Sequence, residues 1–184
     1  MSAVVVGTGR RSLAFVAYLD HAATTPVRPE AREAMLPWLG ARTGNPSGAH
    51  RAARAARRAV DDARDVIAAV TGFEAGDVVF TAGGTEADNL AVFGVLDAVS
   101  SDRPGATAAC PGTEHHAVLE AVERRHGRVL RVGADGQVDL DHLADVLAVD
   151  DVALVSVMAV NNETGVVADL AAVLDLVDER SPGT

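Results

Sequence analysis

The stretch DVVFTAGGTEADNL, residues 77–90, changes from a strand-like to a helix-like pattern within a few positions. Val78, Val79 and Phe80 are β-branched or aromatic, two glycines follow, and the residues from Thr85 onward have helical spacing. Thr85, with Asp88 three positions later, also matches a helix-capping pattern. The stretch therefore predicts a strand, a glycine turn and a helix that begins near Thr85.

The predicted start of this helix would suit a phosphate group. Gly84 has no side chain, so the backbone there can come close to a ligand. The first N–H groups of a helix have no partner within it and lie at the positive end of the helix dipole, which attracts anions. The same residues also fit an ordinary strand–helix turn with a good cap, and this stretch alone leaves both interpretations open.

The rest of the chain repeats the alternation of strands and helices. Further strands are predicted at 106–110, 128–132 and 152–157, and helices at 29–39, 49–70, 87–99, 116–125, 140–147 and 170–178. The strand at 152–157 is apolar throughout, as in a parallel sheet that is buried on both faces. The sequence therefore predicts an α/β fold with a predominantly parallel sheet and flanking helices. In the helix at 49–70, the spacing predicts a buried stripe that includes Ala56, Ile67 and Val70.

Composition argues against several classes of function. Sixteen basic and 26 acidic residues give a formal net charge of −10 at pH 7, which repels nucleic acids and anionic membranes at long range. We therefore expect neither nucleic acid nor membrane as a partner. Cys110 is the single cysteine, so no internal disulfide can form and a cytoplasmic location is expected. All sixteen basic residues are arginine, so the chain contains no lysine.

Three polar loops are expected at the carboxyl edge of the sheet, at 83–85, 113–116 and 161–163. Ligands of open α/β sheets collect beyond that edge. Each loop also has a plain structural explanation, since acidic residues start helices and asparagines accept turn conformations. Together, at successive strand ends, the loops predict one pocket. The side chains of adjacent histidines diverge, so His115 and His116 do not predict a metal site.

Five stretches of the sequence stand out as motifs, one after another along the chain. They are YLDHAATTPVRPEA (18–31), GNPSGAH (44–50), FTAGGTEADNLAV (80–92), TEHHAV (113–118) and VMAVNNETGVV (157–167). Together they resemble the cysteine desulfurases of the aminotransferase class V group, over about residues 18–180. The resemblance implies the type I fold of pyridoxal-phosphate enzymes. Residues 1–17 are then expected to be an N-terminal extension, and residues 18–184 an incomplete cofactor-binding large domain.

The resemblance implies roles for five residues. Gly84 and Thr85 would hold the phosphate of pyridoxal 5'-phosphate, and His115 would stack on the cofactor ring and carry protons. Asn162 would donate a hydrogen bond to the phenolic oxygen of the ring, and Asn45 would lie near the substrate. The implied reaction converts L-cysteine to L-alanine and passes the sulfur to an acceptor protein, for iron–sulfur cluster assembly or tRNA thiolation. A homodimer is also implied.

The sequence departs from this family in one respect. The family binds its cofactor covalently through a lysine, and these 184 residues contain none. We therefore expect the N-terminal portion of a desulfurase that is inactive on its own. The sulfur-accepting cysteine of the family is expected beyond residue 184, and Cys110 is expected to be a small buried residue. A selenocysteine lyase, another class V enzyme, or a non-catalytic module that binds a desulfurase subunit are alternatives that the sequence leaves open.

Overall fold

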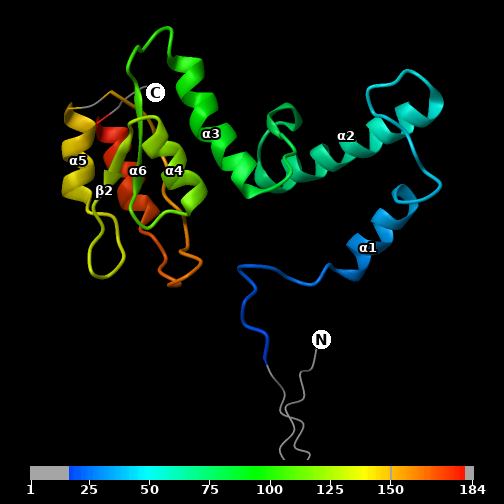
Figure 1. Ribbon diagram of the computed structural model, residues 1–184, viewed down its shortest axis with the longest axis horizontal. Helices are drawn as coiled ribbons and strands as arrows, with labels where there is room; N and C mark the ends of the chain where they lie inside the picture. Colours follow the sequence, from blue (N-terminus) through cyan, green and yellow to red (C-terminus); the bar gives the residue numbers. More distant parts are fainter. Residues whose placement is uncertain (1–16, 150, 181–184) are drawn as a thin grey trace, which may run out of the picture. The chain divides into compact units, whose positions relative to one another are not determined.

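The computed structural model describes residues 17–149 and 151–180 (Figure 1). Contacts divide the chain into two compact units, with the boundary between Val79 and Phe80. The predicted extension at residues 1–17 lies, except for its last residue, outside the described residues. Among the helices that are described, none is both long enough and apolar enough to cross a bilayer.

The N-terminal unit is helical. Helix α1 (Pro29–Met35) continues into the 3-10 turn η1 (Leu36–Trp38), because Pro37 has no N–H group and ends the regular helical pattern. Helix α2 (Arg51–Thr71) ends at Gly72 in the left-handed conformation, and the short turn η2 (Ala75–Asp77) follows. The helices predicted at 29–39 and 49–70 are therefore confirmed, with small shifts at their ends.

Helix α2 buries a different set of residues from the predicted stripe. Ala53, Ala56 and Ala68 are buried, whereas Ile67 and Val70 are exposed. The glycine-containing loop before the helix explains part of this difference, because a Cβ atom added at Gly48 would lie 2.9 Å from the Cβ of Ala53. The loop therefore packs on Ala53, and the predicted stripe is confirmed at Ala56 but wrong at Ile67 and Val70.

The C-terminal unit contains a three-stranded parallel sheet with the strand order β2-β1-β3. The strands are β1 (Thr107–Pro111), β2 (Arg128–Leu130) and β3 (Val152–Val155). The helices are α3 (Gly84–Val99), α4 (His116–Arg124), α5 (Leu140–Val149) and α6 (Leu170–Arg180). This arrangement confirms the predicted α/β class with a parallel sheet and flanking helices.

Central strand β1 divides the core of this unit into two layers. Ala108 and Cys110 pack with residues of α3 and α4, whereas Ala109 between them packs with residues of α5 and α6. Successive residues of a strand point to opposite faces, so one helix pair covers each face of the sheet (Figure 1). All three residues are fully buried.

The strand predicted at Val78–Phe80 is wrong. The segment between η2 and α3 is irregular, and the sheet of the described residues consists of β1, β2 and β3. Val79 and Phe80 are 63% and 48% exposed. A β-branched run becomes a strand only where a neighbouring strand offers its backbone and its side chains for pairing, so local propensity was insufficient here.

We predict that Gly127→Ala lowers the stability of the C-terminal unit by about 1–3 kcal/mol. A Cβ atom at this position would overlap the carbonyl oxygen of Ala108 and lie 2.6 Å from Cγ1 of Val122, and both neighbours are buried. The loss of stability is measured by thermal unfolding, with circular dichroism as the signal. Gly94→Ala is the matched control, because Gly94 is exposed within α3 and alanine there should add up to about 1 kcal/mol. Equal melting temperatures for the two variants would contradict this packing.

Candidate functional site

Helix α3 begins at Gly84, earlier than predicted. Gly83 is the N-cap, and the first hydrogen bond of the helix runs from the N–H of Ala87 to the carbonyl of Gly83 over 3.1 Å. The predicted cap by Thr85 is therefore wrong. Instead, the Glu86 carboxylate reaches back and accepts a hydrogen bond of 2.7 Å from the N–H of Ala82. The N–H groups of the first turn, including that of Thr85, have no acceptor within the helix.

The space in front of this helix start is open. A Cβ atom added at either Gly83 or Gly84 would have no other atom within 4 Å. A cavity of about 570 Å³ lies there, lined by residues 82–86 and Asn89. Gly84 and Thr85 thus border a space in which the unpaired N–H groups and the positive end of the α3 dipole favour an anion.

His115 is the N-cap of the neighbouring helix α4. Its Nδ1 accepts a hydrogen bond of 3.2 Å from the N–H of Ala117. Because Nδ1 is the acceptor, the geometry assigns the proton of the neutral ring to Nε2. The cap thus fixes both the orientation and the tautomer of the imidazole, and the side chain remains exposed.

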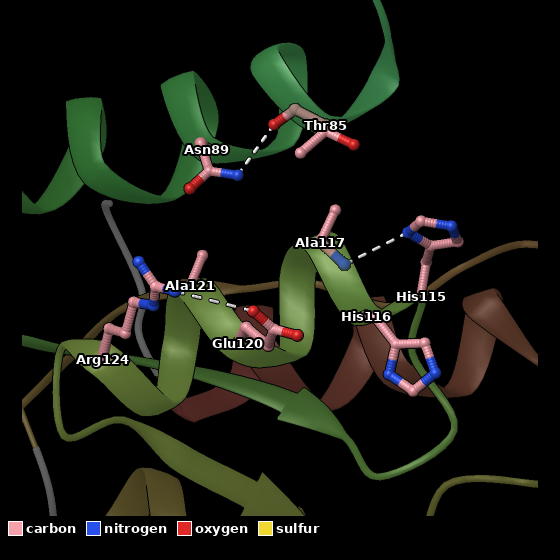
Figure 2. Close-up of a pocket in the computed structure, with 8 residues that line it drawn as sticks. All are labelled: Thr85, Asn89, His115, His116, Ala117, Glu120, Ala121 and Arg124. Carbon is pink, nitrogen blue, oxygen red and sulfur yellow. Dashed lines mark hydrogen bonds and ion pairs between the residues drawn. The ribbon is translucent and has the colours of Figure 1, made fainter.

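The starts of α3 and α4 share a cavity of about 350 Å³ (Figure 2). Thr85 and Asn89 line it from α3, and the loop and α4 contribute His115, His116, Ala117, Glu120, Ala121 and Arg124. Figure 2 shows Thr85 on the ribbon of α3 across the cavity from the labelled residues of α4. Thr85 and His115, which are 30 positions apart in the sequence, therefore border the same space.

The loop after β3 is tied to the loop that carries His115. Nδ2 of Asn161 donates a hydrogen bond of 3.0 Å to the carbonyl of Thr113. Asn162 is the next residue along the chain; it is exposed and is not among the residues that line the cavity in Figure 2. The sequence motifs pointed to Asn162 and not to Asn161 as a site residue, although an asparagine that opens a glycine-containing turn is a recognisable signal.

Glu114 is the buried charged residue of the site. Only 8% of its surface is exposed, and its carboxylate accepts hydrogen bonds from the N–H of His115 (3.2 Å) and the hydroxyl of Ser156 (3.4 Å). Ser156 directly follows β3, so Glu114 links the two strand ends. Sequence patterns gave no signal for this role, because glutamates are rarely buried.

Asn45 lies in the N-terminal unit. Its Oδ1 accepts a hydrogen bond of 3.0 Å from the N–H of Ser47, and its carbonyl accepts one of 2.9 Å from Gly48. These bonds close a tight turn just before α2. The role of Asn45 near a substrate stays a prediction.

The histidines at the start of α4 do not converge. The ring centres of His115 and His116 are 6.4 Å apart and tilted by 58°. Within residues 17–149 and 151–180, no group of three or more His, Cys, Asp or Glu side chains is arranged to hold a metal ion.

This α/β unit has the architecture of the large domain of type I pyridoxal-phosphate enzymes. Among solved structures, a NifS-like protein from Rickettsia africae matches with a TM-score of 0.77 and 30% identity, over 89% of this chain and 45% of that chain. The sequence profile of the aminotransferase class-V family matches residues 17–181. The chain therefore belongs to this family, whose members depend on pyridoxal phosphate.

Curated relatives of the chain are cysteine desulfurases. An IscS-like cysteine desulfurase of Mycobacterium tuberculosis is 45% identical over 164 residues, which is 85% of this chain and 42% of that protein. The cysteine desulfurase IscS of Dictyoglomus turgidum is 40% identical over 88% of this chain and 42% of its own length. The chain thus spans about two fifths of the length of these relatives.

Cys110 lies in the middle of this unit rather than at the cavity. It is fully buried, and its pKa is raised to about 12, mainly by burial and further by the charges of Glu114 and Glu123. A thiol in this environment stays protonated at neutral pH, so it is a poor nucleophile. Its position, as expected from the sequence, is that of a small core residue.

We predict that Cys110 reacts with Ellman's reagent at pH 8 only after the chain is unfolded. The thiolate is the reacting form, and at a pKa of about 12 it is about one part in ten thousand at this pH. The measurement compares native protein with protein in guanidinium chloride, where the single thiol should react fully. Rapid reaction of the native protein would contradict the burial of Cys110.

Proposed function

We propose that this chain is part of a pyridoxal-phosphate-dependent cysteine desulfurase, and that it holds the phosphate and the ring of the cofactor. The observation that carries the proposal is the cavity shared by Thr85 and His115 beside the start of α3. The names of the relatives support the reaction. A solved structure titled "SspA in complex with cysteine", which is 29% identical to this chain with a TM-score of 0.76, supports the substrate.

The residues at the start of α3 fit the phosphate end of this cofactor. The backbone at Gly83 and Gly84 carries no side chain, and a Cβ atom at either position would project into open space. Phosphate oxygens would accept hydrogen bonds from the first N–H groups of α3 and from the hydroxyl of Thr85. Hydrogen bonds to a charged acceptor contribute more than neutral ones, so these few groups are sufficient to orient the ligand.

His115 fits a ring bound in the same cavity. Its imidazole would stack on the pyridine ring. In the neutral ring held by the cap, Nε2 carries the proton, so this atom would donate a hydrogen bond to the substrate and would take up a proton only after giving its own away. Asn162 would donate a hydrogen bond to the phenolic oxygen of the ring. The chemistry that the cofactor supplies when bound is withdrawal of electrons from the substrate. A covalent link through a lysine side chain is not available within these 184 residues, which contain no lysine.

The proposed overall reaction transfers one sulfur atom. L-cysteine and an acceptor thiol would give L-alanine and a persulfide, so the carbon–sulfur bond breaks and a sulfur–sulfur bond forms. Cys110 is not proposed as this thiol, because it is fully buried and protonated. We further propose a cytoplasmic homodimer that passes the sulfur to a protein of iron–sulfur cluster assembly or tRNA thiolation.

We predict that Thr85→Val weakens the binding of pyridoxine 5'-phosphate by about tenfold or more, because one hydrogen bond to a charged phosphate is lost. This probe has no aldehyde, so it reports non-covalent binding alone. Equilibrium dialysis measures its dissociation constant, and that of pyridoxine, which lacks the phosphate, should not change. Thr71→Val at the end of α2 is the control. An equal loss for both probes would contradict a phosphate site at Thr85.

We predict that His115→Asn and His115→Ala separate the two roles of this residue. Asparagine can still cap α4, whereas alanine should lower stability by about 1 kcal/mol. Both substitutions remove the ring, so both should weaken the binding of pyridoxine 5'-phosphate to a similar extent. Thermal unfolding and dialysis are measured on the same samples. If His115→Asn binds the probe as tightly as the unmodified chain, His115 does not stack on the ring.

A further inference from the structure

We propose that Asn161 is the positioning residue that fixes the spacing between His115 and Asn162. This inference rests on the proposed function, since it assigns these two residues to opposite parts of one ligand. Asn161 itself is not proposed to touch the cofactor. It acts through the hydrogen bond from its Nδ2 to the carbonyl of Thr113, across 48 positions of sequence.

The two polar atoms of the Asn161 side chain, Oδ1 and Nδ2, form hydrogen bonds in different loops. Its Oδ1 accepts hydrogen bonds from the N–H groups of Glu163 (3.0 Å) and Thr164 (2.9 Å), which close the turn after β3. Its backbone completes the same turn with Val166 and Gly165, over 2.8 Å in each case. Nδ2 has no part in this turn and donates to the other loop. An aspartate could form the turn equally well, so only the bond to Thr113 requires an amide.

The loop that receives this bond is held from both sides. Thr113 lies two residues before His115, and the intervening Glu114 is tied to Ser156 at the end of β3. The N–H of Glu114 also donates to the carbonyl of Pro111 over 3.1 Å, which closes the tight turn at the end of β1. Loosening the bond of Asn161 therefore releases the loop at the point where it turns toward His115.

Asn162 is placed by the same contact. It follows Asn161 directly, so its backbone moves with the turn that Asn161 closes and anchors. One amide side chain thus sets both halves of the proposed ring site. In site geometry of this kind, a shift of about 1 Å is enough to lose most of the function.

The test compares the unmodified chain with Asn161→Asp, which keeps the turn acceptors and loses the donor to Thr113. We expect the hydrogen exchange of the N–H groups of Glu114 and Ala117 to increase by about fivefold, which is the effect of one lost hydrogen bond. We also expect the ¹⁵N signal of His115 Nδ1 to shift toward that of a ring without its Ala117 partner. Asn161→Ser, which is uncharged and too short to reach Thr113, replaces this variant if the aspartate form does not fold.

Gln137→Glu is the matched control. Nε2 of Gln137 donates to the carbonyl of Val167 over 2.9 Å, and its Oε1 accepts from the N–H of Asp169 over 3.0 Å. The substitution therefore makes the same change of amide to acid, with the same added charge, in the same unit. It should leave the signals of His115 and the exchange of Ala117 unchanged. Equal perturbation by both variants, or no perturbation by Asn161→Asp, would overturn the proposal.

Different results would contradict the proposed function and the positioning role of Asn161. Exchange and the His115 signal are measured on protein without ligand, so they test the tie between the loops whatever the chain binds. The dissociation constant of pyridoxine 5'-phosphate is then measured for the same variants, and Asn161→Asp should raise it several-fold. Failure of the unmodified chain to bind the probe would remove the proposed function. Normal binding by Asn161→Asp, despite a loosened loop, would remove the positioning role.

Discussion

The parallel pairing of β1 with a strand on each side is the constraint on which the rest of the C-terminal unit depends. Ala108, Ala109 and Cys110 are small enough for helices to pack closely on both faces of this strand, and all three are fully buried. Because β1 and β3 run in the same direction, their carboxyl ends lie at one edge of the sheet. The contact of Asn161 with the carbonyl of Thr113 follows from this direction. An antiparallel β3 would place its following loop at the opposite edge. Loops that are far apart in the sequence thus lie close together because the sheet is parallel.

The proposed anion site lies in a chain with a formal net charge of −10, and local geometry resolves this apparent conflict. Charges separated by more than about 8 Å are largely screened at physiological ionic strength, so the total charge affects the approach of polyanions more than the binding of one phosphate. Near the start of α3, the Glu86 carboxylate turns back to the N–H of Ala82. At the start of α4, the Glu114 carboxylate is held by hydrogen bonds from His115 and Ser156. Each of these two carboxylates already accepts hydrogen bonds from neighbouring protein groups. At the α3 cavity, the N–H groups of the first turn and the helix dipole supply the local attraction for an anion.

The sequence was sufficient to predict the fold class and the elements whose pattern is strong, such as α4, α5 and the central strand. It failed where the outcome depends on a partner that is distant in the chain. Val78–Phe80 has the composition of a strand, yet pairing decides whether a strand forms. The stripe on α2 failed because many of its small residues are alanines, so spacing alone could not identify the face on which the loop with Gly48 packs. For the site, motifs identified Thr85 and His115. They could not identify Glu114 or Asn161, whose importance lies in hydrogen bonds to residues about 40 or more positions away.

His115 shows how one residue can serve stability and chemistry without a compromise between them. Its cap uses Nδ1, and this bond begins α4 and holds the imidazole in one orientation. The cap leaves the proton on Nε2 in the neutral ring, so the fold itself selects the tautomer in which that atom is a hydrogen-bond donor. A histidine elsewhere in the loop would have to lose rotational freedom each time a ligand binds. At the N-cap, that entropy is lost once, when the helix forms. The position of the histidine at the first step of α4 is therefore the feature that connects the folding of this unit to the activity proposed for it.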